Sequence, residues 1–195
     1  MKFTRDGLFT AILVVAALFV GSLVTSNLPQ PDALLTDRPF LHAVTVGETA
    51  NLRTGDVTIT DVQAAKRVKL FGRIAESAAV WIVVDLEWEP VRQPGMIAAS
   101  NPVVVAADGR VFGGSQAVTN NCGPTQPRMA VACQLAYEVS IDALEGARLR
   151  VPAGSSVTTS DDVADVDLGI DASTAAAFAQ TDSQIDLLET TAVTR

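Results

Sequence analysis

The sequence predicts an all-β protein: an immunoglobulin-like antiparallel β-sandwich preceded by a single N-terminal transmembrane helix. Three observations lead to this prediction. An uncharged apolar run occupies residues 7–24, short alternating segments recur within residues 42–171, and turn residues separate those segments. Alternation of apolar and polar residues is typical of half-buried strands, and several short strands separated by turns favour a sandwich.

The N-terminal run favours an uncleaved signal anchor that makes the membrane a partner through residues 7–24. About 18 helical residues span roughly 27 Å, close to the thickness of a bilayer core. A cleavable signal has a shorter apolar region and a small-residue cleavage site, and no clear site follows residue 24. Because Lys2 and Arg5 precede the run, we expect a single-pass protein with a cytoplasmic N-terminus and an extracytoplasmic domain. If the run is cleaved, the protein is secreted.

Composition divides the chain into four predicted segments. They are a signal anchor at residues 1–24, a Pro-containing linker at 25–41, the sandwich at 42–171, and an acidic, weakly ordered tail at 172–195. The net charge is −8, and eight acidic residues but one basic residue follow Ser155. Nucleic-acid binding needs clustered Lys and Arg, so no nucleic-acid partner is expected.

The strongest predicted strand covers residues 81–89, which alternate between two faces. One face is apolar and is expected to point inward: Ile82, Val84, Leu86 and Trp88. The opposite face carries Trp81, Asp85, Glu87 and Glu89. Further strands are expected at 56–62, 131–139, 147–151 and 163–170. A hairpin is expected at 103–112, with Asp108 and Gly109 both at positive φ in a two-residue turn.

Two cysteines, Cys122 and Cys133, predict one disulfide in an exported chain. Gly and Pro residues between them favour a turn that brings the ends together. The chain-entropy model gives such a short loop about 3 kcal/mol of stabilisation. Two cysteines and one distant histidine, His42, make a poor ligand set, so no metal is expected.

Several short motifs resemble the telokin-like, immunoglobulin-like extracellular domains of unknown function in Gram-positive and actinobacterial secreted or membrane-anchored proteins. The similar pieces are residues 46–50, 81–86, 108–110 and 135–139, with a final Val-x-Leu strand. The resemblance implies a two-sheet sandwich, a membrane or lipoprotein tether, and no established catalytic residues. The chain departs from the family in its transmembrane segment, which replaces a lipobox, and in its acidic tail.

Candidate catalytic residues are sparse. His42 is the single histidine, and no Gly-x-Ser-x-Gly nucleophile elbow accompanies it. Glu87 and Glu89 share a strand face and could serve as the carboxylate pair of a glycosidase, although a solvated outer face also explains them. The acids of residues 161–171 lack the glycine and glutamate of an EF-hand loop, so a solvated strand edge is expected there.

These patterns predict a non-enzymatic, membrane-anchored extracytoplasmic module that binds an unknown protein or cell-envelope component and needs no cofactor. The expected partner surface is formed by Trp81, Asp85, Glu87 and Glu89, or by the disulfide loop. Two alternatives stay open. One is an envelope glycan hydrolase that uses the strand carboxylates, and the other is a structural accessory subunit that contacts a membrane complex through its helix.

Overall fold

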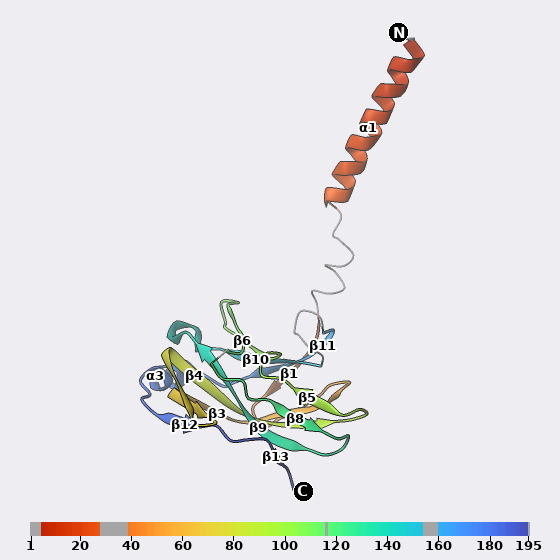
Figure 1. Ribbon diagram of the computed structural model, residues 1–195. Coiled ribbons are helices and arrows are strands. Elements are labelled where there is room, and N and C mark those ends of the chain that lie inside the picture. Colours follow the sequence, from red (N-terminus) through yellow and green to blue (C-terminus); the bar gives the residue numbers. More distant parts are fainter. Residues whose placement is uncertain (1–4, 28–38, 116, 154–159, 195) are drawn as a thin grey trace. The chain divides into compact units, whose positions relative to one another are not determined.

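The computed structural model describes residues 5–27, 39–115, 117–153 and 160–194. The chain divides into two compact units, Met1–Arg38 and Pro39–Arg195. The first unit contains the helix α1 (Arg5–Asn27), and the second contains the sheets (Figure 1).

None of the helices in the described ranges combines the length and the hydropathy that a bilayer crossing requires. This finding does not support the transmembrane helix predicted at residues 7–24, which stays a prediction. The linker predicted at residues 25–41 falls mostly outside the described residues: α1 continues to Asn27, and the first strand begins at Phe40.

The second unit is all-β in its main elements, as predicted. One sheet has the strand order β1 (Phe40–Thr45), β11 (Asp162–Asp167), β10 (Arg148–Pro152), β6 (Val103–Val105) and β7 (Val111–Phe112). The larger sheet has the order β12 (Gln184–Asp186), β3 (Gly55–Leu70), β4 (Arg73–Pro90), β9 (Val131–Val139) and β13 (Thr191–Ala192), and β2 (Thr49–Asn51) pairs with β3. A third, two-stranded sheet joins β5 (Gly95–Ile97) to β8 (Cys122–Thr125).

The larger of two hydrophobic clusters in the described ranges joins the two larger sheets. The predicted inward face of β4 is confirmed, because Ile82, Val84 and Leu86 are at most 1% exposed. They belong to the same cluster as Leu149 of β10 and Val166 of β11. Burying an aliphatic side chain of this size contributes about 1.5–3 kcal/mol, so these alternating strands hold the sheets face to face.

The strand pairing is not wholly antiparallel, which corrects the prediction. The first strand, β1, pairs in parallel with β11, and β12 pairs in parallel with β3. The hairpin between β6 and β7 is present, but its turn is wider than expected. Gly109 has φ +87° and donates its backbone N–H to the carbonyl oxygen of Ala106, whereas Asp108 does not have a positive φ.

The C-terminal segment is ordered, so the prediction of a weakly ordered tail at 172–195 is wrong. It contains α3 (Ala172–Ala179), β12 and β13. Asp171 caps α3 by accepting a hydrogen bond from the backbone N–H of Thr174 at 2.7 Å. The segment then adds β12 to one edge of the larger sheet and β13 to the other. Between these strands, Leu187 is buried in a second hydrophobic cluster.

Candidate binding pocket

The partner surface predicted on β4 is not an open face. Trp81 is only 1% exposed and lies in the second cluster with Leu187, so its predicted place on a contact surface is wrong. The physical reason is that the C-terminal segment covers this part of the sheet. Asp85, Glu87 and Glu89 follow on the same face and are half-buried.

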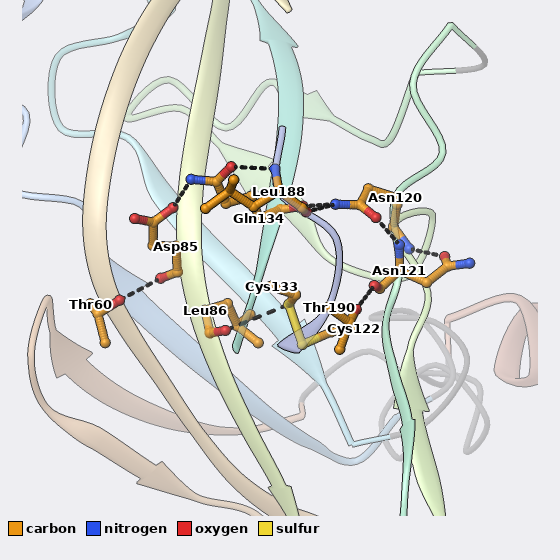
Figure 2. The surroundings of a disulfide bond; sticks show 11 residues. Thr60, Asp85, Leu86, Asn120, Asn121, Cys122, Cys133, Gln134, Leu188 and Thr190 are labelled. Carbon is orange, nitrogen blue, oxygen red and sulfur yellow. Dashed lines mark hydrogen bonds between the residues drawn. A yellow bond between two sulfur atoms is a disulfide. The ribbon is translucent and has the colours of Figure 1, made fainter. Parts of the chain in front are cut away.

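The predicted disulfide is confirmed. It joins Cys122 of β8 to Cys133 of β9, whose Cα atoms are 5.3 Å apart. Figure 2 shows that polar side chains around this bond fasten the C-terminal segment. Asn120 donates to the carbonyl oxygens of Gln134 and Leu188 at 2.7 and 3.0 Å. The side-chain carbonyl of Gln134 accepts from the backbone N–H of Leu188 at 2.9 Å.

The Asp85 carboxylate belongs to this same fastening network. It accepts a hydrogen bond of 2.7 Å from the side-chain amide of Gln134 (Figure 2). Asp85 and Glu189 both line a cavity of about 140 Å³ beside Cys133. The geometry therefore gives Asp85 a structural role in holding the C-terminal segment.

A second cavity, of about 490 Å³, lies where the start of β3, the end of β4, β5 and the end of β10 meet. Its apolar walls come from Trp88, Pro94, Met96, Ile97 and Pro152. Its polar lining comes from Arg53, Thr54, Arg92, Gln93 and Asn101. Ligand sites in proteins have this size and this mixture of apolar walls with a few polar groups. We therefore take this pocket, called the loop pocket below, as the candidate site.

The indole ring of Trp88 is held in place by two glycines. A Cβ atom at Gly55 would lie 2.4 Å from the Trp88 ring, and one at Gly95 would lie 3.2 Å from it. Trp88 is only 4% exposed, and its indole N–H has no hydrogen-bond partner among the described residues. The ring therefore acts as a fixed apolar wall of the loop pocket.

Arg53 is oriented by Asp161 and Asp162, at the start of β11 (Asp162–Asp167). Its backbone N–H donates to Asp162 Oδ2 at 2.7 Å, and its guanidinium pairs with Asp161. Asp162 is buried, and its other oxygen lies 2.6 Å from Nε2 of His42. His42 thus has a structural partner at the edge of the domain, and the positive charge of Arg53 is largely compensated.

Arg92 differs from most arginines of this protein. The chain has 22 acidic and 14 basic residues, and six of the arginines in the described ranges pair with acids: Arg53, Arg67, Arg110, Arg128, Arg148 and Arg150. Arg148, for example, donates to Asp165 at 2.9 Å and to Asp167 at 3.2 Å. Asp162 and Asp165 are buried, and β11 lies between β1 and β10, so the solvated strand edge predicted at residues 161–171 is wrong for these two acids. Asp161 and Asp171 are exposed, as predicted. Arg92 is exposed, and no acidic side chain in the described ranges pairs with it.

Sequence reasoning missed the loop pocket. Its residues come from four separate segments, and each segment alone is a generic turn or strand end. The one local indication is the sequence Pro90-Val91-Arg92-Gln93-Pro94-Gly95, which follows the strongest predicted strand. Two prolines and a glycine there indicate an ordered loop, and an ordered loop with a charged side chain is a frequent place for binding residues.

Comparison with known proteins adds one structural similarity. The chain is similar to the crystal structure of the YjhA protein from Bacillus subtilis, a structural genomics target, with a TM-score of 0.42 and 10% sequence identity. The match covers 64% of this chain and 98% of that chain. No protein-family model and no curated protein matches the chain.

Proposed function

We propose that this protein is a non-enzymatic extracytoplasmic binding module with an immunoglobulin-like sandwich, tethered to the cell membrane through residues 7–24. Two sheets around one core support the sandwich, and the family resemblance of the sequence agrees with it. The disulfide between Cys122 and Cys133 supports export to an oxidising compartment. The uncharged run at residues 7–24 supports the tether.

We place the binding activity in the loop pocket. Arg92 carries this proposal, because it lies beside apolar walls and has no acidic partner among the described residues. An arginine without an acidic partner in an acidic chain is available to an external anion, and its planar guanidinium suits carboxylate or phosphate groups. Trp88 and Met96 would contact an apolar part of the same ligand. The ligand class is therefore a protein or envelope group that joins an anionic group to an apolar body.

The alternative of a glycan hydrolase at Glu87 and Glu89 has less support. A glycosidase places its two carboxyl groups on either side of a cleft that holds the sugar. Neither glutamate lines the two cavities described above. The carboxylates that do share a cavity, Asp85 and Glu189, face about 140 Å³, which is well below the size of typical ligand sites.

Photocrosslinking in intact producing cells tests the binding proposal. A benzoylphenylalanine that replaces Gln93 at the loop pocket should capture one partner, and Arg92→Glu should remove the capture. The same group in place of Gln180, the C-cap residue of α3, should not capture it, because α3 and β5 lie on opposite sides of the domain (Figure 1). Capture that persists in Arg92→Glu, or capture from a position in residues 7–24 alone, contradicts the pocket. The second result favours the accessory-subunit alternative.

A further inference from the structure

We infer that the tip of the β3–β4 hairpin is a second contact site, which inserts shallowly into an anionic lipid surface. The tip consists of residues 70–74, where β3 ends at Leu70 and β4 begins at Arg73. It lies at the far end of β3 from the loop pocket, which is lined by residues next to Gly55. The inference uses none of the pocket residues and is independent of what the pocket binds.

The backbone of the tip is unfavourable for the residue that it carries. Leu70 and Arg73 are paired across a two-residue turn, in which Phe71 has φ +49° and Gly72 has φ +78°. Turns with positive φ at both central positions favour Asn-Gly. A bulky side chain in the left-handed region is disfavoured, because its Cβ crowds the backbone. Local folding preferences therefore do not explain the phenylalanine.

Burial does not explain it either. The Phe71 residue is 72% exposed, and Ile74 on the same tip is 58% exposed. The neighbouring Leu70, by contrast, is 8% exposed and packs in the second cluster. A residue that is both strained and exposed marks a position where function outweighs folding.

The charge around the tip differs in sign from the charge of the chain. Residues 66–76 contain four bases and one acid, Glu76, which is in register with Arg67 across the hairpin, although the whole chain carries −8. The bases are Lys66, Arg67, Lys69 and Arg73. Asp182 compensates Arg67 at 3.1 Å, and Asp186 compensates Lys69 at 2.7 Å. Lys66 lies outside the tip and donates to the carbonyl oxygen of Ala79 at 3.5 Å. Within the described ranges no acidic side chain pairs with Arg73, so the tip presents this one positive charge beside its apolar groups.

An anionic bilayer surface fits this arrangement better than a protein pocket does. The tip is a projecting turn, and a bilayer accepts such a group without a matching cavity. Aromatic and aliphatic side chains partition just below the headgroups while arginine contacts the lipid phosphates. The polar backbone groups of the turn limit insertion to this shallow depth. A second copy's loop pocket is disfavoured, because Arg92 there, which has no acidic partner among the described residues, would face Arg73.

Insertion at the tip would place one end of the long strand β3 at the lipid surface. The 16 residues of β3 extend over about 50 Å at roughly 3.3 Å per residue, so the loop pocket lies about that far from the tip along the strand.

The test measures contact between the tip and lipid in the full chain. The chain is reconstituted into vesicles of phosphatidylcholine and phosphatidylglycerol with brominated acyl chains, which quench nearby tryptophans. I74W provides a reporter on the tip, and V111W provides a matched reporter at another site, where the native residue is 60% exposed. We expect quenching of the tip reporter to exceed that of the control roughly threefold. Adding Phe71→Asn to the I74W variant should lower the quenching of its reporter to the level seen with V111W.

A second measurement separates a functional Phe71 from a structural one. Because Asn-Gly suits this turn, Phe71→Asn should raise the melting temperature by about 2–4 °C while it removes the lipid contact. A lower melting temperature would show that Phe71 serves folding and would overturn the inference. Equal quenching of both reporters, or none of either, would also overturn it. If the tip reporter is quenched equally in vesicles without phosphatidylglycerol, the surface that it contacts need not be anionic, and that part of the inference is wrong. If the tip crosslinks to a protein and its reporter is not quenched, the tip binds a protein partner and not lipid.

Discussion

Gly55 at the start of β3 should tolerate no side chain, although it lies in ordinary strand backbone. A Cβ atom there would lie 2.4 Å from one ring carbon of Trp88 and 2.5 Å from the carbonyl oxygen of Glu89. A Cβ atom at Gly95 would also lie 3.2 Å from the ring, and the carbonyl belongs to the strand that pairs Gly55 with Pro90. Neither neighbour can move without disturbing the floor of the loop pocket or the sheet.

The expected loss in Gly55→Ala follows from two opposing effects. Overpacking of a fixed site costs about 1–3 kcal/mol, and two close contacts, one with backbone, favour the upper part of that range. Alanine also restricts the unfolded chain more than glycine does, which stabilises the folded state by about 0.4–1 kcal/mol. The net loss of about 2 kcal/mol should lower the melting temperature by roughly 4–8 °C in a domain of this size.

Thermal and guanidinium unfolding of the full chain measure this loss. Gly113→Ala is the matched control, because a Cβ atom there meets nothing within 4 Å and should leave the melting temperature unchanged or slightly higher. If Gly55→Ala unfolds within about 0.5 kcal/mol of the parent protein, the Trp88 ring moves freely. The argument for a fixed pocket wall would then be wrong.

Three further changes test other parts of the fold. Replacing Cys122 and Cys133 together by alanine should reduce the free energy of unfolding by about 3 kcal/mol. The parent protein, denatured without reductant, should show no free thiol. Two labelled thiols would refute the disulfide. Deleting residues 181–195 should expose Trp81, which is 1% exposed in the intact chain, and shift its fluorescence to longer wavelength; unchanged emission would show that the segment does not cover it. Hydrogen bonds from the first turn of α3 lower the pKa of Asp171 to about 2. The stabilisation of α3 by this cap is therefore complete above the unfolded-state pKa near 3.9 and is lost as the pH falls towards 2. NMR chemical shifts of Ala172–Ala179 should follow this change, and a pH response that survives in Asp171→Ala would contradict it.

The core strands could be predicted from the sequence because their pattern is local. Every second residue is apolar from Val80 to Trp88 in β4 and from Val131 to Val139 in β9, so the burial of Val84 and Leu135 can be predicted from the residues around them. The same logic failed at Trp81. Its burial depends on Leu187, which is more than a hundred residues away and lies between strands of three and two residues. Alternation cannot be recognised in strands that short.

The candidate site could not be predicted for a related reason. Arg53 and Arg92 line one cavity only because β3 and β4 pair along their length and bring the start of one to the end of the other. Neither residue has a sequence motif that distinguishes it from paired arginines such as Arg148. Whether an arginine is paired is a property of the folded chain, so the feature that carries the proposed function is absent from local sequence patterns.

The two proposed contact sites lie at opposite ends of β4, and this arrangement leads to a final prediction. Arg73 begins β4 and Arg92 follows its end, and neither has an acidic partner among the described residues. The strand between them has 18 residues and extends over roughly 60 Å. At that separation the charges are screened from each other in physiological salt, where the Debye length is about 8 Å.

The two sites should therefore act independently. Arg73→Glu should weaken lipid quenching at the tip and leave crosslinking from Gln93 unchanged, and Arg92→Glu should do the reverse. The double variant should show both losses at their single-variant size, because effects at distant sites that share no partner add. If either charge reversal alone abolished both readouts, the two arginines would belong to one extended surface, and the division into a pocket and a lipid-contacting tip would be wrong.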